Sequence, residues 1–220
     1  MKRLLSALAA AALVAALPGP ALSATHHDAA GAATPAATTV SAKLADTKDA
    51  LRGLWFEHIF WVRNVVVARL AGDEGAARAA EAQVVANAKA IAGAVEPFYG
   101  KAASDQLFKL LAGHWGAISE YLDATRTGSK AQQGAAFTKL NANAGEIAAF
   151  LAGANPHWPV ATLRGLLTAH GAHHVQQIQE LHAGQYDAEA RTWAAMASHM
   201  NVIADALAAG LAAQFPAKFQ

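Results

Sequence analysis

The chain has 220 residues, of which 54% are hydrophobic and only 15% charged, so it can bury a core and is not a disordered protein. Its formal net charge of +1 provides no basic surface for nucleic acid. The sequence has no cysteine, which excludes disulfides, thiolate nucleophiles and thiol-ligated metals. Alanine is abundant and runs of strand-forming residues are nearly absent, so the predicted fold class is all-α.

The first 24 residues have the form of a secretory signal peptide. Two basic residues precede an apolar run, 4–17, which is followed by small residues suited to cleavage after Ser23 or Ala24. This run is shorter than the roughly 20 residues needed to span a bilayer. We therefore expect residues 1–24 to be removed and 25–40 to form a flexible leader. The protein is then expected to be periplasmic or secreted, with no membrane span after cleavage.

Cleavage at either position would place a histidine third from the new amino terminus. The residue in question is His26 or His27, depending on the site of cleavage. A free amine, two backbone amides and an imidazole in the third position form a square-planar set of four nitrogens suited to Cu(II) or Ni(II). The alternative is a polar spacer that happens to contain two histidines.

Beyond residue 40 the hydrophobic pattern is helical almost throughout and is interrupted by glycine and proline. We predict a single helical domain over 41–220. Six helices are expected, near 41–71, 74–96, 103–126, 131–152, 159–183 and 187–213.

These helices are predicted to form three tandem copies of a two-helix hairpin. Gly72, Gly128 and Gly184 lie 56 residues apart, each at the break between the two helices of a pair. The hairpins are expected near 41–96, 103–152 and 159–213. The prediction is therefore a six-helix bundle built from three repeats.

Polar residues interrupt the apolar face of every helix at one level of these hairpins. They are His58, His114 and His170 on the first helices and Asn87, Asn143 and His199 on the second. In an antiparallel hairpin the two positions are nearly equidistant from the turn, so their side chains can face each other. The sequence therefore predicts a polar layer across the core.

Two interpretations of this layer are open. An imidazole or amide buried without a partner costs about 1–3 kcal/mol, so the groups must bond to one another or hold a further species. In the first interpretation, histidine and asparagine pairs only fix helix register in a structural scaffold or a small-ligand-binding bundle. In the second, histidines from three parallel helices bind a transition metal, copper or zinc first, in a binding or storage role.

The metal interpretation involves further residues. The candidate ligands are His58, His114, His170, His174 and His199. Asn87 and Asn143 would hold the imidazoles in place by hydrogen bonds. Glu57 and Asp205 adjoin the layer and would support the ligands or, in a third and less favoured interpretation, act as acid or base in an enzyme.

Several motifs occur in a specific order along the chain. They are Leu54-Trp55-x-x-His58-x-x-Trp61-x-Arg63, Pro97-Phe98-Tyr99-Gly100, Leu110-Leu111-x-x-His114, Asn143-Ala144-x-Glu146-Ile147-Ala148-x-Phe150-Leu151, Ala154-Asn155-Pro156-x-Trp158-Pro159 and Gln214-Phe215-Pro216-x-x-Phe219. Together they resemble the motifs of a largely uncharacterised bacterial family of small helical proteins, some of whose members are labelled glycosyltransferases. The sequence has no Gly-rich phosphate loop and no nucleophile elbow, so we expect no nucleotide cofactor and can name no catalytic residues independent of a metal.

Overall fold

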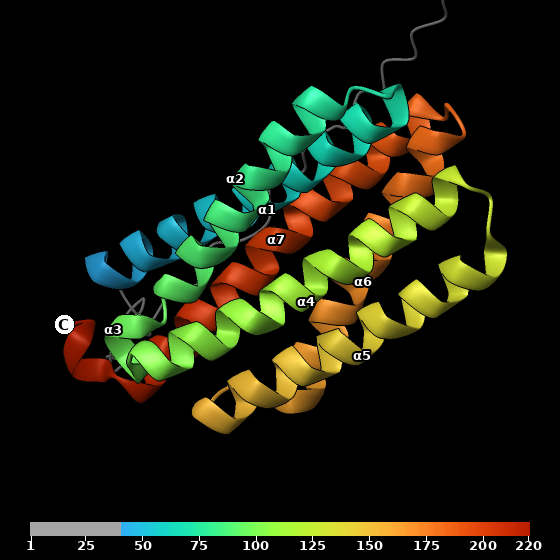
Figure 1. The fold of residues 1–220 in the computed structure, drawn as a ribbon. Helices are drawn as coiled ribbons and strands as arrows, with labels where there is room; N and C mark the ends of the chain where they lie inside the picture. The colour runs from blue at the N-terminus through green and yellow to red at the C-terminus, as the bar shows by residue number, and fades with distance from the viewer. Residues whose placement is uncertain (1–40) are drawn as a thin grey trace, which may run out of the picture. The chain divides into compact units, whose positions relative to one another are not determined.

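The structure, a computed structural model, describes residues 41–220. The predicted signal peptide, the leader and the candidate copper site at His26 and His27 lie outside these residues. Helices make up nearly all of the described chain (Figure 1). They are α1 (Ala42–Ala71), α2 (Glu74–Gly93), α3 (Glu96–Tyr99), α4 (Lys101–Arg126), α5 (Lys130–Ala154), α6 (Val160–His182), α7 (Tyr186–Gln214) and the short 3-10 helix η1 (Pro216–Lys218). The predicted all-α class with six long helices is confirmed.

The short helix α3 is the main departure from the predicted elements. Helix α2 was expected to continue to about residue 96 but ends at Gly93. Pro97 has no backbone N–H and its ring collides with the preceding turn, so it cannot lie inside a helix. It lies instead in the first turn of α3, where a free N–H is not needed.

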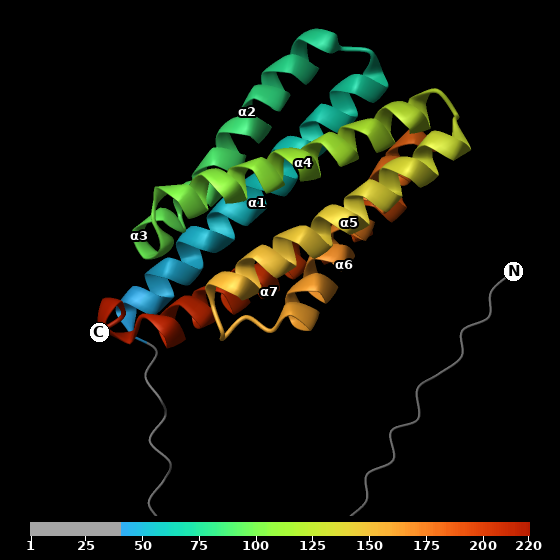
Figure 2. The same ribbon diagram turned by 60° about the horizontal axis from the view of Figure 1, so that its bottom comes forward.

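The six long helices form a closed ring. Each packs against two neighbours in the order α1, α2, α4, α5, α6 and α7, and α7 packs back against α1 (Figures 1 and 2). Helix α6 also contacts α4 and α1. Helix α6, which carries His170, therefore packs against both of the other helices that carry the repeated histidines.

The turns of the three hairpins have the same geometry. Gly72, Gly128 and Gly184 adopt left-handed φ angles of 75°, 73° and 67°. In each turn the residue after the glycine donates its N–H to a carbonyl five residues earlier, closing the helix end as in a Schellman motif. A 56-residue repeat predicts that the three turns have the same geometry.

Two apolar clusters fill the core, with the repeated histidines between them. On α1, Trp55 belongs to one cluster and Val62 to the other, and His58 lies between these residues. On α4, Leu111 and Trp115 belong to different clusters in the same way, on either side of His114. The polar layer thus separates two apolar halves of the bundle.

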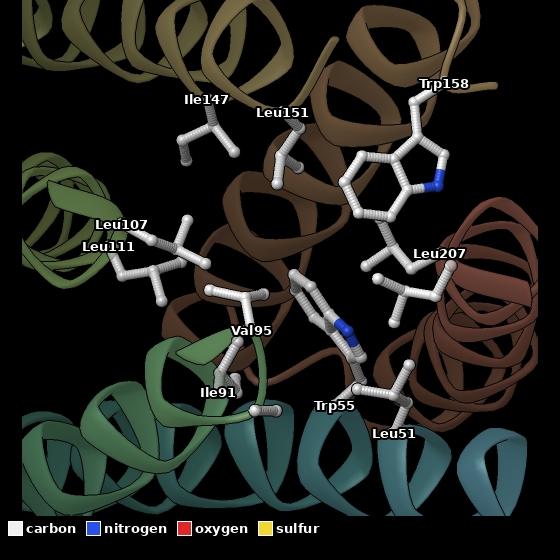
Figure 3. Close-up of a pocket in the computed structure, with 12 residues that line it drawn as sticks. Leu51, Trp55, Ile91, Val95, Leu107, Leu111, Ile147, Leu151, Trp158 and Leu207 are labelled. Atoms are coloured by element: carbon white, nitrogen blue, oxygen red, sulfur yellow. The ribbon is translucent and has the colours of Figure 1, made fainter. Parts of the chain in front are cut away.

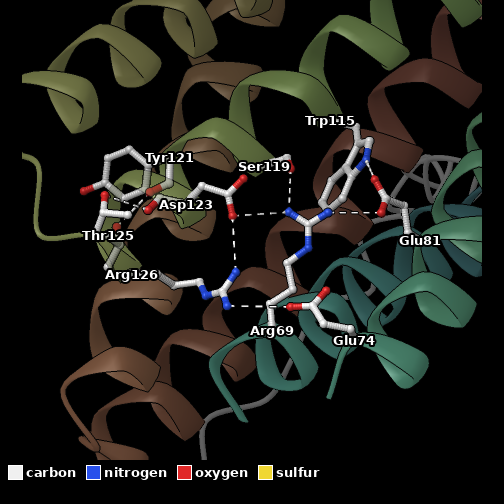
Figure 4. Close-up of polar contacts among 10 residues, drawn as sticks. Arg69, Glu74, Glu81, Trp115, Ser119, Tyr121, Asp123, Thr125 and Arg126 are labelled. Carbon is white, nitrogen blue, oxygen red and sulfur yellow. Dashed lines mark hydrogen bonds and ion pairs between the residues drawn. The ribbon is translucent and has the colours of Figure 1, made fainter. Parts of the chain in front are cut away.

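A hydrogen-bonded network fixes α4 against the first hairpin (Figure 4). The Arg69 guanidinium donates to Ser119 Oγ at 2.7 Å and to Glu81 Oε2 at 3.0 Å. Trp115 Nε1 donates to the other oxygen of the Glu81 carboxylate at 3.0 Å. Because Trp115 follows His114, these bonds help to set the rotation of α4 that turns the imidazole inward.

Replacing Gly210 with alanine is expected to destabilise the protein by about 1–3 kcal/mol through overpacking. A Cβ atom at this position in α7 would overlap the indole ring of Trp158. Gly53 on α1 is the matched control, because it is exposed and a Cβ there would meet nothing within 4 Å. Gly53→Ala is expected to stabilise by about 0.5–1 kcal/mol through helix propensity. Urea unfolding followed by circular dichroism measures both, and equal effects of the two variants would contradict the prediction.

Candidate metal centre

Four buried imidazoles meet in the middle of the bundle. They are His58 on α1, His114 on α4, and His170 and His174 on α6. One ligand nitrogen from each residue lies within 4.8 Å of those from the other three. We call these four residues the histidine cluster. The structure therefore brings together four of the five histidines that the sequence suggested as ligands.

The spacing of the rings suits a bound ion. Their centroids lie between 4.4 and 6.1 Å apart. A tetrahedral metal with M–N bonds of about 2.0–2.1 Å would hold four ring centres roughly 5 Å apart. The ligand nitrogens, which lie within 4.8 Å of one another, would move closer together to bind one ion.

His170 and His174 form the closest pair. They lie one helical turn apart on the same face of α6, and their Nε2 atoms are 3.2 Å apart. One nitrogen can donate a hydrogen to the other, or both lone pairs can bind one metal. A tetrahedral site with the same bond lengths would hold two ligand nitrogens about 3.3 Å apart.

Burial keeps the histidine cluster neutral. It lowers the pKa of His58 to about 3 and that of His114 to about 4. The pKa values of His170 and His174 also fall well below the ordinary value of 6.5, first through burial and then through the neighbouring imidazoles. At neutral pH each ring therefore carries one nitrogen lone pair, which is the form that binds metals.

Most of the buried ring nitrogens have no hydrogen-bond partner. The unpaired atoms are His58 Nε2, both nitrogens of His114, and Nδ1 of His170 and of His174. Leaving a buried polar atom unpaired costs about 1–3 kcal/mol. A layer that served only to fix register would be expected to pair these atoms, whereas a bound ion would use up one lone pair on each ring.

The polar residues of the second helices make a different contact. Asn87 Nδ2 donates to the carbonyl oxygen of Leu54, and Asn143 Nδ2 to that of Leu110, both at 3.0 Å. His199 Nε2 makes the equivalent contact with the carbonyl oxygen of Leu166 at 2.8 Å. These side chains thus tie the two helices of each hairpin together. His199 is half-buried and lies outside the histidine cluster.

The two carboxylates suggested from the sequence also lie outside the histidine cluster. Asp205 accepts two hydrogen bonds from Arg52, at 2.9 and 2.7 Å. Glu57 is exposed and accepts from Trp61 Nε1 and Asn87 Nδ2, each at 3.3 Å. Among residues 41–220, the grouping that could hold a metal contains histidine alone.

A partly buried ion pair was not predicted from the sequence. Arg63 on α1 donates to both oxygens of Glu189 on α7, at 2.6 and 2.8 Å, and Gln177 Nε2 donates to Glu189 Oε1 at 2.8 Å. The guanidinium lowers the pKa of the Glu189 carboxyl. Arg63 and Glu189 are 126 positions apart and obey no helical spacing, so no local pattern indicated the contact.

Figure 3 shows a small apolar cavity in the core. Trp55 and Trp158 line it with aliphatic side chains from the surrounding helices. The ring of Trp55 also lies 6.1 Å from the rings of His58 and His170, measured between centroids. The free space is about 30 Å³, whereas sites for drug-sized ligands occupy about 300–1,000 Å³. This cavity offers little support for a small-ligand-binding bundle.

Known proteins give no indication of the function of this chain. No family model, curated protein or solved structure matches the chain. Among the helices between residues 41 and 220, none is both long and apolar enough to cross a membrane. The chemistry of the histidine cluster is therefore the main guide to function.

Proposed function

We propose that the protein binds one transition-metal ion, copper or zinc first, through His58, His114, His170 and His174. The observation that carries this proposal is the convergence of four buried imidazoles whose nitrogens mostly lack partners. Neutral imidazole suits both metals. The scaffold alternative is supported by the contacts of Asn87, Asn143 and His199, which link helices without involving the histidine cluster.

The number of ligands favours binding or storage over catalysis. Catalytic zinc sites keep one coordination position open for water or substrate, whereas structural sites are closed by four protein ligands. The histidine cluster supplies four nitrogens and would fill a tetrahedral ion. We further propose that binding takes place in the periplasm or outside the cell, as the predicted signal peptide implies, and that the chain belongs to the helical family its motifs resemble.

The charge of the site favours copper in its +1 state. All four ligands are neutral imidazoles, and the histidine cluster includes no carboxylate to offset the charge of an ion. The desolvation energy of an ion rises with the square of its charge, so a +2 ion costs about four times as much to bury as a +1 ion of similar size. We therefore expect Cu(I) to bind more tightly than Zn(II).

Metal analysis of the full chain without an affinity tag tests the proposal. The His26→Ala, His27→Ala background removes the candidate terminal copper site. We expect one equivalent of Cu(I) or Zn(II) to remain per chain after gel filtration. The exposed His182→Gln variant should bind the same amount, because His182 lies outside the histidine cluster. Failure of the parent chain to retain stoichiometric metal after challenge with Cu(I), Zn(II) and Fe(II) would refute the proposal.

A further inference from the structure

The histidine cluster lies where a hydrated ion cannot reach it directly. Its four residues are 1–5% exposed and lie between the two apolar clusters. An ion loses hydration energy on entering such a region unless protein ligands replace its water step by step. Uptake therefore needs ligands closer to solvent.

The third hairpin carries two further histidines of this kind. His173 on α6 and His199 on α7 are both half-buried, and their ring centroids lie 5.5 Å apart. The positions equivalent to His173 in the other hairpins are Trp61 and Ala117, and those equivalent to His199 are asparagines. Only the third hairpin thus has an imidazole at both places.

Each of these rings has a nitrogen available to an ion. His199 Nε2 must carry its hydrogen, because it lies 2.8 Å from the Leu166 carbonyl oxygen, which can only accept. The lone pair of His199 is then on Nδ1. His173 Nδ1 makes no hydrogen bond, so no contact there fixes which nitrogen of this half-buried ring carries the lone pair. The bond to Leu166 also holds the His199 ring in a fixed orientation, as bonds to metal-ligating histidines commonly do.

The pair adjoins the histidine cluster. His173 directly precedes His174 on α6 and lies three residues after His170, a spacing that places two side chains next to each other on a helix. A path of imidazoles therefore leads from the half-buried pair to two of the buried ligands.

We propose that His173 and His199 form an uptake site, which takes a Cu(I) or Zn(II) ion from solvent and passes it to the histidine cluster. The transfer is ligand exchange: one imidazole nitrogen replaces another on the ion, and no electron moves. This inference rests on the proposed function, because it concerns the route to the same site.

The rate of metal uptake tests this inference. The probe is Zn(II) presented by a chromophoric chelator and followed by stopped-flow absorbance in the His26→Ala, His27→Ala background. The variant is His173→Ala with His199→Asn, which introduces the residues found at the equivalent positions of the second hairpin. Asparagine at 199 can keep the bond to Leu166, as Asn143 keeps its bond to Leu110.

We expect uptake and release in the double variant to slow on the order of tenfold, with one equivalent still bound at equilibrium. His182→Gln is the control and should leave both rates unchanged. Unchanged rates in the double variant would overturn the uptake site while leaving the buried site intact. Loss of equilibrium binding in the double variant would also overturn it, because the pair would then be ligands of the final site. Failure of the parent chain to bind metal would instead refute the proposed function.

Discussion

Replacing His114 with leucine is expected to weaken metal binding and, at the same time, to stabilise the metal-free protein. His114 is 3% exposed, and neither of its ring nitrogens has a hydrogen-bond partner. Removing two unpaired polar atoms in favour of an apolar side chain of similar size should raise the free energy of unfolding by about 1–3 kcal/mol. A bound ion acts against this difference in stability, because at 1,000 times its dissociation constant it stabilises the parent chain by about 4.1 kcal/mol and stabilises the variant, which has lost one of four ligands, by less.

Urea unfolding with a chelator, and again with excess Zn(II), measures both effects. His182→Gln is the control, because this exposed histidine should change neither the stability nor the response to metal. The metal-free measurement separates the two interpretations of the polar layer. Were His114 needed only to hold helix register, leucine would destabilise the protein with and without metal, and the parent chain would gain nothing from the ion.

Acidification of the metal-free protein is expected to destabilise it progressively below pH 6.5, before most carboxylates titrate. Folding lowers the pKa of His58 to about 3 and of His114 to about 4, from an ordinary value of 6.5. Below pH 6.5 the unfolded chain therefore binds protons that the folded chain excludes, so stability is full above this pH and falls as the pH decreases. Below pH 6.5 each of these two histidines lowers the free energy of unfolding by about 1.4 kcal/mol per pH unit. The two together lower it by roughly 5 kcal/mol at pH 4.5.

That loss is comparable to the whole stability of many domains, about 5–15 kcal/mol, and His170 and His174 act in the same direction. Urea unfolding at intervals between pH 7.5 and 5, in the presence of a chelator, measures how the free energy of unfolding changes with pH. Glu189 does not interfere in this range, because its pKa lies below the ordinary 4.5. In a His58→Leu, His114→Leu double variant the free energy of unfolding should depend less steeply on pH, by the equivalent of up to two protons. Stability independent of pH over this range in the parent chain would contradict the prediction.

Much of the fold could be predicted from the sequence because its signals are local. Helical periodicity gave the long helices, and Gly72, Gly128 and Gly184 marked turns that require a left-handed residue. Pro97 was the exception: it ended α2 early and began α3, although the proline could have indicated this.

Part of the candidate site was also predictable. Repeat spacing placed His58, His114 and His170 at one level, and a separation of four residues placed His174 on the same face as His170. These are positions along a helix, which the sequence states directly. The spacing did not show how each helix is rotated about its own axis. It therefore could not predict which polar side chains would come into contact.

The sequence by itself thus determined the six helices, their turns and the level of the polar layer. Only the tertiary structure decided that four histidines converge, that His199 contacts Leu166 instead, and that Asp205 pairs with Arg52. The physical reason is that these choices depend on packing between helices of different hairpins in the closed ring. Contacts such as Arg63 with Glu189 join residues with no periodic relation, so the chain must be folded before they exist.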